Sequence, residues 1–329
     1  MKIWTALDQV PGQERSVVTI GNFDGVHRGH QRVITACVTR ARKHGVEAVA
    51  CTFDPHPIQV HFPQRHLSLI CSVQDRLDLL SATGLDASLV IHYDQTVFTL
   101  DAEEFVATYL VDRLGAVEVV VGEDFRFGRN NEGDVETLRK LGRSFGFDVV
   151  VVADILGPEG RRWSSSWVRE LLAQGDVAGA AQVLGHLHRI RGTVMHGFKR
   201  GRQLGFPTAN LTDDIEGEVP SDGVYAGWLI RQVPGTSAGE FLPAAISVGT
   251  NPQFNGEKRT VEAHVLGRSD LNLYGERIAI SFVDFIRPMM MFDSVEALTD
   301  RMDDDLRQTA QSLGVAPANR VDPSAVSAQ

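Results

Sequence analysis

Several features are scarce or missing in this sequence of 329 residues, and each absence excludes a class of protein. The three cysteines, Cys37, Cys51 and Cys71, are odd in number and lack metal-ligand spacing, which favours reduced thiols in a cytoplasmic protein. The formal net charge is −10 and no block of Lys and Arg stands out, so we expect neither nucleic acid nor a membrane surface as the main partner. No apolar run approaches the roughly 18 residues of a membrane span, and the polar start argues against a signal peptide.

The first half of the chain alternates between strand-like and helix-like segments. Helical periodicity covers residues 31–44, and further helices begin at Ser72 and Asp101, each with an acidic residue three positions on. This β-α-β order predicts an α/β domain with a doubly wound parallel sheet over residues 1–185. Ligands of such sheets bind beyond the carboxyl ends of the strands. The expected strands are 17–20, 48–53, 88–92, 117–121 and 148–153.

The second half changes character after Gly185. Strand-like runs separated by Gly, Pro and Asn turns continue to residue 284, and one helical period begins at Ser294. Many strands and one helix predict a mainly β domain over residues 186–316, an antiparallel barrel with a C-terminal helix. Residues 317–329 are poor in large apolar side chains, and we expect a disordered tail. The expected strands are 189–194, 223–231, 242–248, 259–266 and 277–284.

The most informative run of the chain joins the strand 17–20 to the helix 31–44. It reads Gly21-Asn22-Phe23-Asp24-Gly25-Val26-His27-Arg28-Gly29-His30. Free backbone N–H groups and the positive end of the helix dipole attract phosphate at such a turn, and His27 and His30 add donors. We expect Gly21, Phe23 and Gly25 in the turn to bind the ATP phosphates as well. The pattern favours a polyphosphate site for adenylyl transfer over a surface helix start.

Two more loops at the predicted ligand edge carry unusual residues. Asp54, Pro55 and His56 follow the second strand, and the run Gly122-Glu123-Asp124-Phe125-Arg126-Phe127-Gly128 follows the fourth. Each could be a tight turn with a packed aromatic side chain. Because both fall at the same sheet edge, the sequence favours a ligand-binding role for Asp124, Phe125 and Phe127 as well.

A further phosphate-binding candidate begins the next helix. Ser165 and Ser166 stand between Arg162 and Arg169. Hydroxyl groups at a helix start either cap the helix or bind phosphate oxygens, and the two guanidinium groups could hold the same polyphosphate.

The second half contains its own candidate site, in the run Gly201-Arg202-Gln203-Leu204-Gly205-Phe206-Pro207-Thr208-Ala209-Asn210. Pro207 fixes the backbone before Thr208, whose hydroxyl is a hard ligand suited to Mg²⁺, as is the amide oxygen of Asn210. Gly201 and Gly205 would let backbone N–H groups approach phosphates. A plain turn at the barrel rim is the alternative. The sequence has no Walker-type motif.

These motifs resemble those of one family in the same order. The run Gly21–His30 resembles the HxGH signature of nucleotidyltransferases, and its longer form GxFDGxHxGH is similar to prokaryotic bifunctional FAD synthetases. The run from Arg162 to Arg169 resembles the second signature, with Ser166 where Thr is usual. Gly205–Asn210 resembles the riboflavin kinase signature. The resemblance extends through Pro220–Gly227, Gly249–Pro252, Thr260–Glu262, Leu273–Gly275 and Phe292–Ser294. Gln253 departs from the Thr that is frequent in the family.

The resemblance implies two reactions and a role for Glu262. Riboflavin and ATP give FMN in the second domain, where Glu262 acts as general base beside Mg²⁺ held by Thr208 and Asn210. FMN and a second ATP give FAD and pyrophosphate in the first domain, where Asp124 and its neighbours place FMN. The residues alone leave two interpretations of Glu262: an acidic side chain on the solvent-exposed face of a strand, or a base positioned for catalysis. A flavin-sensing barrel, a flavin-storage protein and a transferase with another phosphorylated acceptor stay open, as does self-association.

Overall fold

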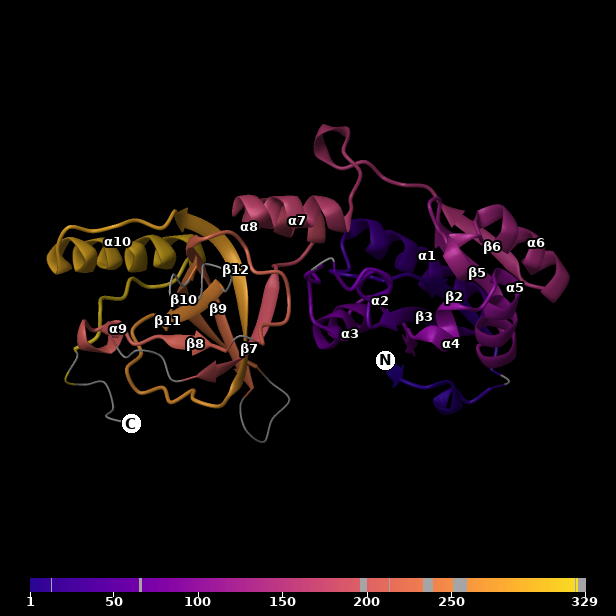
Figure 1. The fold of residues 1–329 in the computed structure, drawn as a ribbon, viewed down its shortest axis with the longest axis horizontal. Helices are drawn as coiled ribbons and strands as arrows, with labels where there is room; N and C mark the ends of the chain where they lie inside the picture. Colours follow the sequence, from indigo (N-terminus) through magenta and orange to yellow (C-terminus); the bar gives the residue numbers. More distant parts are fainter. Residues whose placement is uncertain are drawn as a thin grey trace. The chain divides into compact units, whose positions relative to one another are not determined.

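The computed structural model describes the chain except residues 13, 65–66, 196–199, 213, 233–238, 251–258, 323 and 325–329 (Figure 1). The chain divides into two compact units. One contains Met1–Ser68 and Val73–Ser164, and the other contains Leu69–Ser72 and Ser165–Gln329. The division falls before the two helices that precede the barrel, whereas the sequence suggested a boundary after residue 185. No helix in the described part of the chain is long and apolar enough to cross a membrane.

The first unit is built on a six-stranded parallel sheet with the strand order β1-β4-β3-β2-β5-β6. This confirms the predicted α/β class and five of the strands. The edge strand β1 was not predicted because three residues are too few to show a periodicity. The strands are β1 (Lys2–Trp4), β2 (Ser16–Ile20), β3 (Glu47–Asp54), β4 (Ala87–His92), β5 (Ala116–Gly122) and β6 (Asp148–Val152).

Apolar side chains cover both faces of this sheet. Val17, Ala48 and Val120 belong to the core under α1, whereas Val18 and Val49 belong to the core on the opposite face. Continuous apolar strands are expected where helices cover both faces. The helices are α1 (Arg28–His44), α2 (Pro57–His61), α3 (Val73–Ser81), α4 (Gln95–Phe98), α5 (Ala102–Phe105), the π-helical η2 (Val106–Arg113) and α6 (Val135–Phe145), with 3-10 turns η1 (Leu7–Gln9), η3 (Arg129–Asn131) and η4 (Pro158–Gly160).

The second unit contains a closed antiparallel barrel with the strand order β10-β11-β8-β7-β12-β9. The long helix α10 packs against β9, β10 and β12, and it starts after Ser294 as predicted; the Ser294 side chain caps its first turn. Strand β8 was not predicted, because it has three residues only. The elements are α7 (Ser165–Gln174), α8 (Val177–Leu184), β7 (Arg189–Met195), α9 (Arg200–Gln203), β8 (Ala209–Leu211), β9 (Gly223–Gln232), β10 (Gly239–Thr250), β11 (Arg259–Val265), β12 (Arg277–Arg287) and α10 (Val295–Leu313).

Part of the expected disordered tail contacts the barrel unit. The backbone N–H of Val321 donates to the carbonyl of Gly205 at 3.0 Å, and Ala318 packs beside the cluster of Phe206, Leu266 and Leu306. The segment up to residue 322 therefore has defined neighbours. Residues 325–329 lie outside the described residues, as do Asn251, Pro252 and Gln253.

Candidate active sites

In the first unit, a tight turn carries the chain from β2 into α1. Phe23, Gly25 and Val26 have φ angles of 48°, 78° and 40°, a left-handed region that is uncommon for Phe and strained for Val. Phe23 and Val26 are almost completely buried, so they anchor the turn in the core. The two anchors thereby hold the turn, and His27 directly after it, at the carboxyl end of β2.

His27 and His30 meet at the first turn of α1. His27 is the N-cap, and its Nδ1 accepts a hydrogen bond from the backbone N–H of His30 at 3.4 Å. Their rings stack with centroids 3.7 Å apart. Because Nδ1 of His27 is an acceptor, the proton of the neutral ring lies on Nε2, which is then a donor.

Both imidazoles are held in the neutral form. Burial lowers the pKa of His27 to about 4, and the charge of Arg162 acts in the same direction. Burial also lowers the pKa of His30 well below its usual value. At neutral pH the two side chains therefore offer N–H donors without positive charge, and charge for a polyphosphate must come from arginines and the helix dipole.

Gly29 leaves the room that the stacked rings need. A Cβ atom at this position would lie 3.0 Å from Cε1 of His27 and 3.2 Å from the carbonyl oxygen of Trp163. The glycine of the motif is therefore explained by close packing at the histidine pair.

Arg162 lies beside two carboxylates at the ends of β5 and β6. Its Nη2 is 2.7 Å from Oδ2 of Asp124, and its Nε is 2.9 Å from Oδ2 of Asp154. The structure thus joins two predicted residues, Arg162 and Asp124. It adds Asp154, which the sequence did not mark because an acid after a strand gives no signal until its partner is known.

The remaining predicted flavin residues differ in their surroundings. Phe125 and Phe127 stack at 5.3 Å, but Phe127 is buried in the core, so its ring is mainly a packing group. His56 is also buried, and it caps α2 by accepting the N–H of Ile58 at 3.2 Å. Asp54 and Pro55 are half-buried at the end of β3.

An aromatic group that the sequence did not mark lies at the same edge, after β3 and β4. Nε2 of His61 is 2.8 Å from the hydroxyl of Tyr93, and the His61 ring lies 5.1 Å from Phe98. Phe53 contacts Tyr93 edge-to-face at 5.6 Å. The signal was available, because Tyr93 follows a predicted strand in one of the expected ligand loops.

Ser165, Ser166 and Arg169 belong to α7, in the second unit. Their local position at a helix start agrees with the sequence. Whether they join His27 and His30 at one polyphosphate site stays a prediction.

In the second unit, the glycines of the run 201–210 are packed against the chain itself. A Cβ atom on Gly201 would lie 2.5 Å from the carbonyl oxygen of Phe206, and one on Gly205 would lie 2.4 Å from that of Val321. Gly205 also has a φ of +86°. Close chain packing therefore requires both glycines, independently of any phosphate.

Thr208, Asn210 and Glu262 form a hydrogen-bonded group where β8 pairs with β11. The Thr208 hydroxyl donates to Oε2 of Glu262 at 3.1 Å and accepts from Nδ2 of Asn210 at 3.1 Å. Glu262 lies opposite Asn210 in the strand register. Burial raises the pKa of Glu262, and the bond from Thr208 partly opposes that shift. A half-buried carboxylate with a raised pKa is suited to accept a proton.

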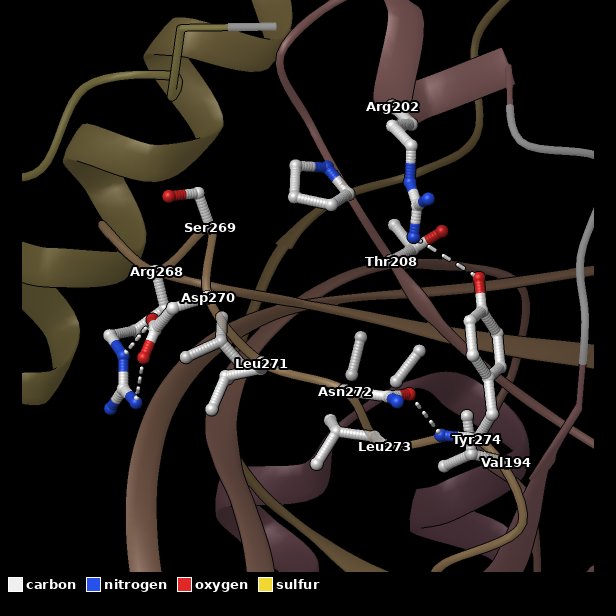
Figure 2. Close-up of a pocket in the computed structure, with 14 residues that line it drawn as sticks. Val194, Arg202, Thr208, Arg268, Ser269, Asp270, Leu271, Asn272, Leu273 and Tyr274 are labelled. Carbon is white, nitrogen blue, oxygen red and sulfur yellow. Dashed lines mark hydrogen bonds and ion pairs between the residues drawn. The ribbon is translucent and has the colours of Figure 1, made fainter. Parts of the chain in front are cut away.

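Two cavities lie on opposite faces of β11. The first, of about 80 Å³, is lined by Ala263 and Val265 together with Arg202 and the loop before β12; Figure 2 shows Arg202 directed at the Tyr274 hydroxyl, 3.3 Å away. The second, of about 260 Å³, is lined by Glu262, methionines and Phe292. Thr208 borders both cavities. One side chain therefore links a polar pocket and an apolar pocket beside a carboxylate.

Comparison with known proteins agrees with this arrangement. The FAD synthetase family model matches residues 10–167, and the riboflavin kinase model matches residues 184–313. A bifunctional riboflavin kinase/FMN adenylyltransferase of Escherichia coli K12 is 35% identical over 89% of this chain and 90% of its own. A protein of the same name from Pseudomonas fluorescens is 35% identical over 94% of this chain and 96% of its own.

A solved structure shares the whole fold. It is the crystal structure from Streptococcus pneumoniae described as a macrolide-efflux protein, with a TM-score of 0.81 and 31% identity over 92% of this chain and 96% of that chain. Its description concerns that protein, whereas the two family models and the curated relatives agree on flavin chemistry. The chain belongs to the family of bifunctional riboflavin kinase/FMN adenylyltransferases, the enzymes that convert riboflavin to FMN and FMN to FAD.

Proposed function

We propose that each unit carries one of the two reactions, and that the Thr208–Glu262 group performs the phosphorylation of riboflavin. The observation that supports this most directly is the position of Glu262, which lines the apolar cavity and accepts a hydrogen bond from a residue that also borders the polar one. An acceptor alcohol and a nucleotide phosphate would meet at that point.

In the kinase reaction, the apolar cavity takes the flavin and the polar cavity takes ATP. Methionine and phenylalanine side chains suit a flat aromatic ring system. Glu262 accepts the proton of the riboflavin 5′-hydroxyl as its oxygen attacks the γ-phosphorus, and ADP leaves. Positioning and charge neutralisation supply most of the acceleration in phosphoryl transfer.

The donor set at Thr208 fits Mg²⁺ that arrives with ATP. A hydroxyl and an amide oxygen are hard ligands, and Mg²⁺ usually takes its other positions from phosphates and water. Among the described residues no group of three His, Cys, Asp or Glu could hold a metal alone, which is consistent with a nucleotide-dependent site. Thr208 and Asn210 would hold the ion, and bound Mg²⁺ neutralises phosphate charge.

The adenylyl transfer uses the turn between β2 and α1. A phosphate oxygen of FMN attacks the α-phosphorus of a second ATP, and pyrophosphate leaves. This nucleophile is already ionised, so donors and positive charge matter more than a base. Nε2–H of His27 and a ring N–H of His30 donate to phosphate oxygens. Arg162 exchanges its carboxylate partners for phosphate, and the phosphate-binding role of Ser165, Ser166 and Arg169 stays a prediction.

The other predicted residues support these roles. Gly21, Phe23 and Gly25 form the turn that borders the phosphates. Asp54, Pro55, Asp124 and Phe125 place FMN together with the aromatic group at Tyr93, and the buried His56 and Phe127 hold these two loops in position. We place the boundary between the two regions at residues 185 and 186. We expect a cytoplasmic enzyme that acts on small molecules rather than on nucleic acid; self-association is a separate question for light scattering.

The test is a time course with riboflavin, excess ATP and Mg²⁺, with flavins separated by chromatography. We expect FMN first and FAD later. FMN without FAD would exclude FMN as the acceptor in the first unit. Tight flavin binding without conversion would exclude both reactions and support a storage or sensor protein.

A further inference from the structure

His264 lies on β11 two residues after Glu262, so both side chains emerge on the same face of the strand. Both line the apolar cavity. His264 is 4% exposed, and its Nδ1 lies 2.8 Å from the carbonyl oxygen of Pro207. Its ring also contacts Phe206 edge-to-face at 5.6 Å. His264 therefore holds the two residues that precede Thr208.

The contact with Pro207 determines which ring nitrogen carries the proton. A carbonyl oxygen can only accept, so Nδ1 of His264 is the donor. Burial lowers the pKa of His264 and keeps the ring neutral. Nε2 is then an acceptor, and within the described residues it is buried without a hydrogen-bond partner. A buried acceptor without a partner is unfavourable unless a ligand or a water supplies a donor.

We propose that Nε2 of His264 accepts a hydrogen bond from a ribityl hydroxyl of riboflavin and thereby contributes to substrate specificity. The inference rests on the proposed flavin site in the apolar cavity. Residues two apart on a strand are separated by about 7 Å. This spacing matches the length of the ribityl chain, so that a flavin with its 5′-hydroxyl at Glu262 would place another ribityl hydroxyl near His264. The imide N–H is at the far end of the flavin ring system from that hydroxyl. Nδ1 meanwhile fixes the Pro207 carbonyl and so the position of Thr208.

Two variants separate these functions of the ring. In His264→Asn, the amide N–H can replace Nδ1–H toward Pro207, but the acceptor at Nε2 is lost. We expect the KM for riboflavin to rise about tenfold or more, the effect of one lost hydrogen bond, while kcat and the KM for ATP stay within about threefold. In His264→Phe, both contacts are lost, and kcat should fall as well because Thr208 is no longer fixed.

An unchanged kcat for riboflavin phosphorylation shows that the barrel unit is folded, and FMN adenylylation in the same preparations measures the amount of intact protein, since that reaction is proposed for the other unit. An unchanged riboflavin KM in His264→Asn would overturn the proposal. A rise in the KM for ATP alone would instead show that the cavity had been assigned to the wrong substrate. 3-Methylriboflavin lacks the imide N–H, so we expect its KM to differ from that of riboflavin by the same small factor in wild type and in His264→Asn. A rise in KM for this analogue that occurs only in wild type would make the imide N–H the donor and overturn the ribityl assignment.

Discussion

The two candidate sites use burial in opposite ways. In the first unit, burial lowers the pKa of His27 and His30 and leaves neutral donors at a helix start. In the second unit, burial raises the pKa of Glu262 and makes its carboxylate a better proton acceptor. The difference follows the chemistry proposed for each, because an ionised phosphate nucleophile needs no base, whereas an alcohol does. The same desolvation therefore serves charge stabilisation at one site and base catalysis at the other.

The largest difference between the two sites should result from removing the proposed base, Glu262. Glu262→Gln keeps the size of the side chain but cannot accept the proton. We expect kcat for riboflavin phosphorylation to fall about 10³-fold, within the usual range for a general base. The rate of FAD formation from supplied FMN should not change. A variant that still phosphorylates riboflavin at a rate near that of wild type would remove Glu262 from the reaction.

The converse variant removes a donor from the first site. His27→Ala takes away both the helix cap and the proposed Nε2–H donor. We expect FAD formation from FMN to fall about 10²-fold, as for loss of one preorganised donor, with riboflavin phosphorylation unchanged. Initial rates of both reactions in one preparation give the comparison. If phosphorylation fell equally in a folded protein, the division of the reactions between the units would be wrong.

A smaller change should disturb the histidine pair without removing it. In Gly29→Ala, the new Cβ would press on the His27 ring and on the Trp163 carbonyl. We expect adenylylation to fall about tenfold because misplaced catalytic groups are costly even when they are present. Thr39→Ala, on the exposed side of the same helix, is the matched control and should keep full activity. Equal activity of the two variants would argue against a precise role for the stacked rings.

Much of the fold could be predicted because its signals are local. Long apolar strands and capped helices are visible in the sequence, whereas β1 and β8 are too short to show a period. The turn at His27 was found because glycines and histidines occur at fixed spacing. Its neutral histidines were not foreseen, since a pKa depends on burial and on Arg162, which is remote in sequence. Asp154 and His264 could not be identified from the sequence, because the role of each depends on a partner that is near it only in the fold. The partner of Asp154 is Arg162, and the partner of His264 is the Pro207 carbonyl.

The smallest expected difference between the two sites is in the pH dependence of their reactions. Phosphorylation needs ionised Glu262, and because the pKa of Glu262 is raised, that activity should decline as the pH falls through a range above the ordinary carboxylate value. Adenylylation should not decline there through His27, which stays neutral until the pH approaches its pKa of about 4. We therefore expect the ratio of phosphorylation to adenylylation to fall as the pH is lowered from neutral toward the ordinary carboxylate range, measured with both substrates saturating. Glu262→Gln should flatten this dependence of the residual phosphorylation. The direct check is phosphorylation alone, and a rate of riboflavin phosphorylation that stays constant as the pH falls through the ordinary carboxylate range would contradict a raised pKa at Glu262.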